Sequence, residues 1–112
     1  MEPVKHPKGW GYELWIANNE KYCGKILHFN KGKRCSYHYH KLKKETFYVE
    51  SGKVELRYGD KFSSKKLVLH PGDSFEVPTG LIHQIFAMQE SKIFEFSTTH
   101  YESDSYRIEL GD

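Results

Sequence analysis

The sequence predicts an antiparallel all-β domain, and three observations support this prediction. Short runs rich in valine, isoleucine, phenylalanine and tyrosine recur about every 8 to 12 residues. Glycine, asparagine, aspartate and serine separate these runs, which is typical of a sandwich or barrel. No window keeps a helical period beyond about two turns. The 112 residues leave room for one core, so we expect residues 1–112 to form a single domain.

The first half of the chain contains five expected strands. An aromatic segment at residues 1–20 holds Trp10, Tyr12 and Trp15, and it would pack either against the domain itself or against a second copy. Because an uncovered edge strand favours association, we expect a homodimer. Turn residues at Asn30–Gly32 and Ser51–Gly52 separate the later runs. The expected strands are Tyr12–Ala17, Tyr22–Phe29, Arg34–His40, Glu45–Glu50 and Gly52–Tyr58.

The second half repeats the pattern with shorter runs. Turns are marked at Gly59–Asp60, at Pro71–Asp73 and at Pro78–Gly80, where proline and glycine favour chain reversal. The expected strands are Lys66–Leu69, Ser74–Val77, His83–Ala87, Lys92–Ser97 and Tyr106–Glu109.

Alternation along three of these runs places charged residues on an apolar face. Lys25 alternates with leucine and phenylalanine, Glu45 with phenylalanine and valine, and Glu95 with isoleucine. A charge in line with apolar residues is costly to bury unless it is paired or bound to a metal. The three residues are therefore candidates for an internal polar site, although each would also reach water if it lies at a strand end.

Four potential metal ligands stand out in the chain: His38, His40 and Glu45 in one short stretch, and His83 after the last turn. The His-x-His spacing puts the first two on one face of a strand. Imidazole and carboxylate ligands in this ratio suit one divalent transition metal such as Zn, Mn, Fe, Ni or Co, with positions left for water or substrate. We expect the other histidines, His6, His28, His70 and His100, to be surface or packing residues.

Charge and cysteine content narrow the expected partners. Seventeen basic and 15 acidic residues give a formal charge of +2, too near balance to indicate nucleic acid or membrane. The basic cluster of Lys41, Lys43 and Lys44 reads as a solvated loop. With no apolar leader or spanning run, Cys23 and Cys35 are expected to be free thiols in a reducing cytoplasm.

The ligand spacing resembles the two sequence motifs of the cupin superfamily. Residues 32–52 match the first motif, from Gly32 through the two histidines and Glu45 to Gly52. Residues 72–87 match the second, except that Ala87 stands where asparagine is usual. Nineteen residues separate the motifs, as in small cupins. The resemblance implies a jelly-roll barrel (the double-stranded β-helix) of two sheets.

A narrower resemblance extends over nearly the whole chain. The opening Gly9–Glu13 is similar to the start of the cupin domain of type II mannose-6-phosphate isomerases, Lys25 and Glu95 fall where that family has lysine and glutamate, and residues 102–109 resemble its acidic tail. The chain differs from that family at His38, where glutamine is common. This resemblance implies aldose–ketose isomerisation of a sugar or sugar phosphate.

The isomerase hypothesis gives each candidate a role. The metal would polarise the carbonyl, and Glu95 would move a proton between adjacent carbons. Lys25 would stabilise a developing oxyanion or hold a phosphate, Arg107 would anchor the anionic end of the substrate, and Tyr48 is a further candidate substrate contact. In the alternative interpretation, Lys25 and Glu95 only pair with each other, and Arg107 only fixes the C-terminal segment.

Two other classes of function use the same ligands. A metal-dependent dioxygenase or lyase would need an apolar cavity, which Phe47, Phe75, Phe94 and Phe96 are available to line, although such residues also build plain cores. A non-catalytic module would bind a sugar or a metal without turnover. Fold alone does not choose among these classes, because the deciding feature is whether a base is aimed into the cavity.

Overall fold

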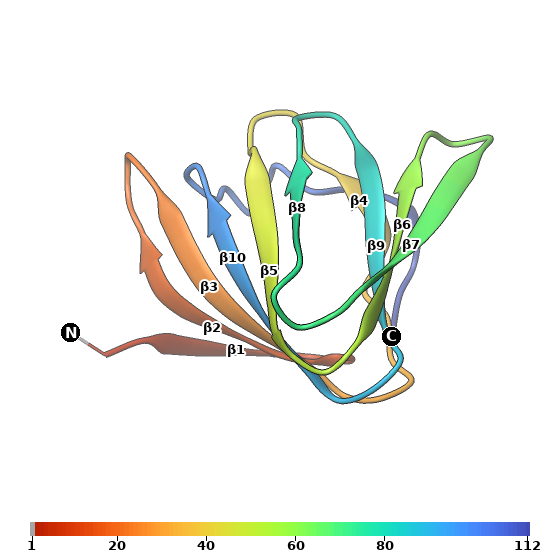
Figure 1. The fold of residues 1–112 in the computed structure, drawn as a ribbon. Coiled ribbons are helices and arrows are strands. Elements are labelled where there is room, and N and C mark those ends of the chain that lie inside the picture. The colour runs from red at the N-terminus through yellow and green to blue at the C-terminus, as the bar shows by residue number, and fades with distance from the viewer. Residues whose placement is uncertain (1) are drawn as a thin grey trace.

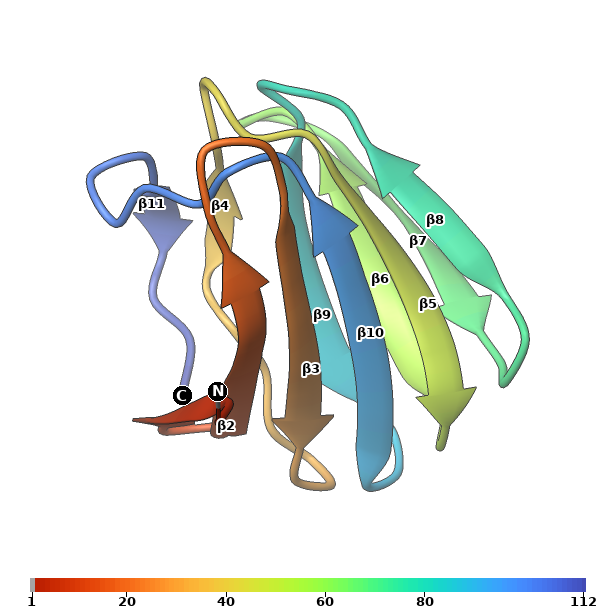
Figure 2. The same ribbon diagram turned by 90° about the vertical axis from the view of Figure 1, so that its left-hand side faces the viewer.

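The computed structural model describes residues 2–112, so Met1, the first residue of the expected aromatic segment, lies outside the described residues. Two antiparallel sheets face each other and enclose the core (Figure 1). Figure 2, turned by a quarter, shows the β2 and β11 strands on one side of the molecule and β7 and β8 on the other. The predicted all-β jelly-roll class is confirmed. Across the described part of the chain, no helix has the length and apolar character that a membrane span requires.

Within residues 2–112, eleven strands make up the two sheets. The first sheet has the order β1-β2-β3-β10-β5-β8 and the second the order β11-β4-β9-β6-β7. The bounds are β1 Val4–Lys8, β2 Gly11–Asn18, β3 Cys23–Phe29, β4 Tyr37–Tyr39, β5 Glu45–Ser51, β6 Val54–Gly59, β7 Ser64–Leu69, β8 Ser74–Val77, β9 Ile82–Ala87, β10 Ser91–Ser97 and β11 Tyr106–Glu109.

Nine of the ten predicted strands are confirmed to within two residues, one is shorter than predicted, and one further strand was not predicted. The strand predicted at Arg34–His40 pairs regularly only over β4, with one isolated bridge between Arg34 and Phe86 before it. Strand β1 was not predicted, because its run contains Pro7 and two lysines. It forms by pairing with β2, whose Trp15 lies opposite Val4. Proline is tolerated there because β1 is an edge strand.

The interior between the sheets has an apolar end and a polar end. Strand by strand, the inward residues change from apolar to charged in the same direction: Phe29 and Leu27 lead to Lys25 on β3, and Ile93 leads to Glu95 on β10. The apolar end is filled by an interlocking cluster that includes Phe29, Val49, Val54, Leu56, Ala87 and Ile93, each 2% exposed or less. Of the two alternatives left open for Lys25, Glu45 and Glu95, the internal position is the one the structure shows, since they are 2–3% exposed.

Loss of packing at the apolar end should cost much more than loss at the surface. Leu56 is fully buried on β6, whereas Phe62 at the tip of the β6–β7 hairpin is 96% exposed. We expect Leu56→Ala to lower the free energy of unfolding by about 2–5 kcal/mol, because it leaves a cavity. Phe62→Ala should change it by about 0.5 kcal/mol or less. Urea unfolding of both variants measures the difference, and equal losses would contradict this assignment of the core.

Candidate metal centre

Three histidines converge at the polar end of the barrel. His38 on β4 lies directly across from His83 on β9, and His40 follows on the same face as His38. Their ligand nitrogens all lie within 4.8 Å of one another. His40 and His83 are buried and His38 is half-buried. The predicted convergence of these three residues is confirmed, and the group is suited to hold one metal ion.

Backbone carbonyls orient all three rings in the same way. Nδ1 of His38 lies 2.8 Å from the Ser36 carbonyl oxygen, Nδ1 of His40 lies 2.6 Å from that of Asp104, and Nδ1 of His83 lies 3.0 Å from that of Leu81. A carbonyl oxygen only accepts, so each Nδ1 carries the ring proton. In the neutral rings Nε2 therefore presents a lone pair, which is the arrangement that metal-binding histidines adopt.

Glu45 completes the cluster beside two of these rings. Its Oε2 lies 3.2 Å from His40 Nε2 and 3.3 Å from His83 Nε2. Both Glu45 Oε2 and His83 Nε2 are buried without a hydrogen-bond partner among residues 2–112. Two lone pairs facing each other in a buried site call for a cation between them. The residues present therefore fit a divalent metal, with three imidazoles as ligands and Glu45 as the fourth.

Ionisation of these groups is compatible with metal binding at neutral pH. Burial and the neighbouring His83 lower the pKa of His38 to about 3, so its ring is neutral. Burial by itself raises the pKa of Glu45, but the positive charge of Lys43 beside it opposes this effect, and the pKa lies well below its usual value. Metal ligands have to be deprotonated, and both residues already are.

Segments from outside the two histidine strands hold the ligands in place. Gly80, in the turn before β9, adopts a φ of +85° that favours glycine, and its N–H donates to the His40 carbonyl over 2.7 Å. Asp104 is 2% exposed, and its carboxylate accepts the backbone N–H groups of residues 41–43 at 2.8–3.1 Å. Together with its carbonyl contact to His40, this makes Asp104 a support of the centre that sequence reasoning missed.

Removal of the Asp104 carboxylate should weaken metal binding. In Asp104→Ala three backbone N–H groups lose their acceptor and the loop after His40 is released, so we expect the dissociation constant for Zn²⁺ to rise about 10- to 100-fold. Competition with a chromogenic chelator measures it. Asp60→Ala is the matched control, because Asp60 also accepts two loop N–H groups, at 2.7 and 2.8 Å, but on the β6–β7 hairpin. Equal affinities in both variants would contradict the supporting role of Asp104.

The centre opens into a cavity of about 650 Å³. Its wall comes from both sheets and includes β2, β3, β10 and β11. Lys25 lines it and is bound to Glu13 over 3.2 Å, with its ammonium 4.4 Å from the centroid of the Trp15 ring. Glu13 also accepts from Trp15 Nε1 over 2.9 Å. Lys25 and Glu95 lie opposite each other on β3 and β10. Each forms its ion pair with another residue, so the alternative in which they only pair with each other is wrong.

Lys43 is the partner of Glu95, which corrects the prediction of a solvated loop. Its side chain is 3% exposed, and its ammonium nitrogen lies 3.0 Å from Glu95 Oε2 and 3.6 Å from Glu45 Oε1. It also lies 3.1 Å from His100 Nδ1. The loop that carries Lys43 turns inward because Asp104 holds its backbone. Its neighbours Lys41 and Lys44 are exposed, as predicted, so charge pattern alone could not separate the three.

The charges in this group set its ionisation. Burial and the nearby Glu45 charge raise the pKa of Glu95. Burial opposes the charge on Lys43, but Glu95 and Glu45 outweigh it, so its pKa lies above the usual value. Burial and the charges of Lys25 and Lys43 lower the pKa of His100 to about 3. His100, expected at the surface or in packing, thus lines the cavity as a neutral ring.

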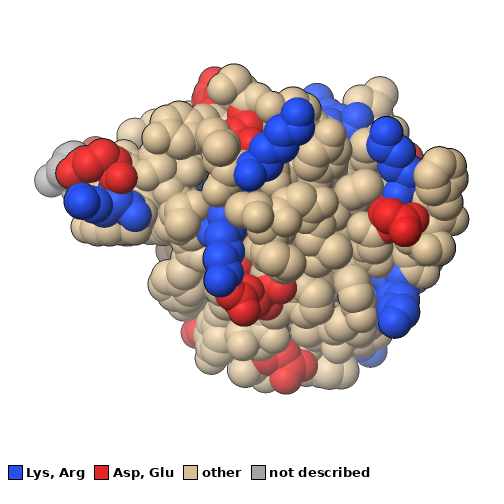
Figure 3. Space-filling view, turned by 90° about the horizontal axis from the view of Figure 1, so that it is seen from above, with Lys and Arg blue, Asp and Glu red and all other residues tan. Residues whose placement is uncertain are grey.

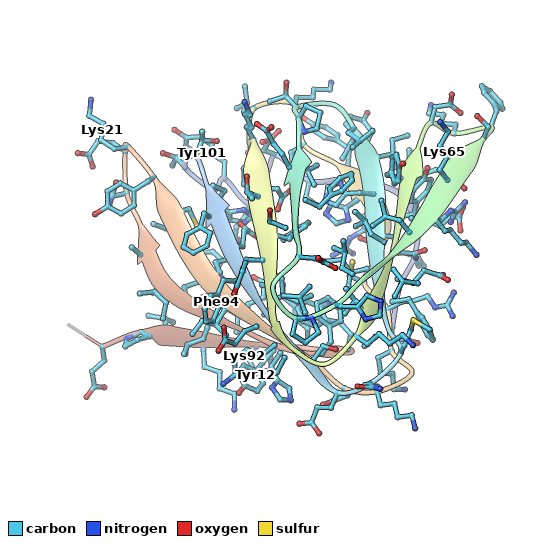
Figure 4. All side chains as sticks on the ribbon, viewed as in Figure 1. Tyr12, Lys21, Lys65, Lys92, Phe94 and Tyr101 are labelled. Atoms are coloured by element: carbon cyan, nitrogen blue, oxygen red, sulfur yellow. The ribbon has the colours of Figure 1, made fainter. Side chains whose placement is uncertain are left out.

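Other predicted site residues have different places. Arg107 lines the cavity, opposite His38 in the β11–β4 pairing. Tyr48 does not line it: its side chain lies on the outer face of β5 and stacks on Phe94 at 6.0 Å, so the proposed substrate contact is wrong for this cavity. Of the four phenylalanines considered as cavity lining, only Phe47 contributes. Phe94 faces outward on the side of Lys92 and Tyr12 (Figure 4).

The outer surface shows no concentration of one charge on the face above the centre. Lysines and arginines lie interspersed with aspartates and glutamates there (Figure 3). Charged residues are concentrated inside the barrel instead. The cavity wall contains Glu13, Lys25, Lys43, Glu45 and Glu95.

Comparison with known proteins gives the family and the fold. The family model described as "Cupin domain" matches residues 25–97. Comparison with curated protein sequences gave no match. Among solved structures, KdgF from Halomonas sp. is 19% identical with a TM-score of 0.78, over 89% of each chain.

Two larger proteins contain a similar domain. The capsular polysaccharide assembling protein CapF from Staphylococcus aureus is 17% identical with a TM-score of 0.82, over 96% of this chain and 34% of CapF. Oxalate decarboxylase from Bacillus subtilis is 21% identical with a TM-score of 0.81, over 95% of this chain and 30% of the decarboxylase. The chain thus spans about a third of these proteins, and at such identities the likeness shows the fold alone. From the matched family model, the chain belongs to the cupin family.

Proposed function

We propose that this protein is a metal-dependent aldose–ketose isomerase acting on a small sugar or sugar phosphate, of the mannose-6-phosphate type. The observation that carries the proposal is Glu95: a buried carboxylate that lines the cavity and reaches the metal site through Lys43. A binding module needs only a shaped cavity, whereas isomerisation needs a base beside the metal.

Glu95 is suited to move a proton between adjacent carbons of the substrate. Its raised pKa brings the carboxylate closer to the range in which a base both accepts and returns a proton. The metal, when bound by His38, His40, His83 and Glu45, would supply a Lewis acid for the carbonyl oxygen. Ser97 donates to Glu95 Oε2 over 3.0 Å and Lys43 over the same distance, so the carboxylate is held in one orientation.

Cationic side chains would accommodate the negative charge of the substrate. Lys25 is buried in the cavity wall, where its ammonium would stabilise charge on a substrate oxygen. Arg107 is exposed, lines the cavity and lies across from His38, so its guanidinium is available to a phosphate group of the substrate.

The character of the cavity favours this reaction over oxygen chemistry on an apolar substrate. Glu13, Lys25, Lys43 and Glu95 line the wall, whereas Phe75, Phe94 and Phe96 do not. Buried charges suit a ligand with several hydroxyl groups, because each hydroxyl both donates and accepts.

Direct observation of the isomerisation tests the proposal. Protein reconstituted with Zn²⁺ or Mn²⁺ is incubated with D-mannose 6-phosphate in deuterated water, and NMR follows the formation of fructose 6-phosphate and the deuterium that it carries at C1. We expect turnover. A chelator should abolish it, because it removes the metal from the centre. D-mannose under the same conditions measures the contribution of the phosphate. If neither sugar is converted by protein that has metal bound, the isomerase proposal is contradicted.

A further inference from the structure

A single contact fixes which ring nitrogen of His100 carries its proton. Lys43 Nζ lies 3.1 Å from His100 Nδ1. A lysine ammonium has three donors and no lone pair, so Nδ1 has to accept this hydrogen bond. A neutral imidazole has only one N–H, which is therefore on Nε2. The three metal-site histidines have the opposite arrangement, since their Nδ1 atoms donate to carbonyls.

The surroundings of Lys43 leave it no freedom to change this role. Its ammonium makes hydrogen bonds to Glu95 Oε2 at 3.0 Å and His100 Nδ1 at 3.1 Å, and an ion pair with Glu45 Oε1 at 3.6 Å. With a carboxylate on two sides, the ammonium keeps its charge, and a second positive charge on His100 would be repelled by it.

His100 is also held in position from the backbone and from the ring edge. Its N–H donates to Asn18 Oδ1 over 2.9 Å, and its carbonyl accepts from Asn18 Nδ2 over 3.0 Å. The ring makes an edge contact with Trp15 at 5.2 Å between centroids. Nε2, on the side of the ring away from Lys43, makes no hydrogen bond to residues 2–112, and the ring lines the cavity.

We infer that His100 is a substrate-contacting residue, whose neutral Nε2–H group, directed by Lys43, donates a hydrogen bond to a carbonyl or hydroxyl oxygen of the bound sugar. This inference rests on the proposed function. Lys43 then serves two groups at once: it holds Glu95 as an acceptor and His100 as a donor on the same cavity wall. A neutral imidazole can stabilise charge on a substrate oxygen without giving up its proton.

The tautomer is measured without reference to activity. We would record long-range ¹H–¹⁵N spectra of the zinc-loaded protein and assign His100 by its absence in His100→Gln. The expected result is a neutral Nε2–H ring for His100 and neutral Nδ1–H rings for the ligands. A Nδ1–H ring or an imidazolium at His100 at pH 7 would overturn the inference. In Lys43→Met the constraint is lost, and we expect a mixture of both tautomers.

Substrate contact is measured by titration with D-mannose 6-phosphate. We expect the His100 Nε2–H signal to shift, and His100→Phe to weaken binding about tenfold, since one hydrogen bond is lost. His100→Gln should stay within about threefold, because its amide offers both an acceptor for Lys43 and a donor for the sugar. Binding that leaves the His100 signal and the affinity of His100→Phe unchanged would overturn the inference. Absence of binding contradicts the sugar-phosphate proposal instead. The tautomer measurement then still tests whether His100 carries its proton on Nε2.

Discussion

Glu95→Gln is expected to lower the rate of isomerisation by about 10²- to 10⁴-fold, which is the usual contribution of a general base. Glutamine keeps the size of the side chain and an oxygen that accepts from Lys43 and Ser97, so the cavity wall stays intact. What is lost is the carboxylate that takes the proton from carbon. Exchange of the C2 hydrogen with deuterated solvent should fall by the same factor as net conversion.

Metal content separates this chemical effect from damage to the centre. Glu95 is not one of the metal ligands, and its carboxylate bonds to Lys43 and Ser97, so Glu95→Gln should bind metal like the original protein. Glu50→Gln is the control for loss of a charge on a sheet, because Glu50 is exposed near the end of β5. Full turnover in Glu95→Gln would refute the role of Glu95 as base. Loss of both metal and turnover would show a structural role only.

Metal binding should raise the thermal stability of the protein strongly. Ligand at about 1,000 times its dissociation constant adds about 4 kcal/mol to the folded state, which corresponds to a rise in Tm on the order of 15 °C for a chain of this size. The gain comes from giving a shared partner to Glu45 Oε2 and His83 Nε2, which are buried without hydrogen-bond partners among residues 2–112. Calorimetry of chelator-treated protein with and without Zn²⁺ measures it.

For each variant, the Tm without Zn²⁺ is subtracted from the Tm with Zn²⁺. This difference does not contain the loss of stability that the mutation itself causes. His83→Ala should show little or no gain on addition of Zn²⁺, whereas His70→Ala should show the full gain, because His70 is exposed and does not line the cavity. An equal gain in His83→Ala would mean that the metal stabilises the protein at another place.

The metal ligands were predictable because their relative positions depend on local sequence spacing. A His-x-His pair on a strand shares one face whatever the rest of the fold does, and His83 follows a marked proline–glycine turn. The inward position of Lys25, Glu45 and Glu95 followed from alternation in the same way. The barrel class followed from regular turns, and the family match at residues 25–97 confirms it.

The supporting residues were not predictable, because their roles depend on long-range contacts. Lys43 stands among two exposed lysines, and only the buried carboxylate of Asp104, 61 positions away, turns it inward. His100 lies in no motif, and its place follows from contacts with Asn18 and Lys43. Tyr48 was misplaced for a simpler reason: strand alternation puts it on the face opposite Glu45 and Phe47. The expected homodimer stays a prediction.

The central claim is that His38, His40, His83 and Glu45 hold one divalent metal, and elemental analysis tests it most directly. The protein is purified without added metal, beside His83→Ala, and both are analysed before and after reconstitution. We predict about one zinc, manganese, iron, nickel or cobalt per chain in the original protein and a small fraction of that in the variant. Zinc or manganese would favour the isomerase. No metal in either protein, even after reconstitution, would contradict the metal centre and the mechanism built on it.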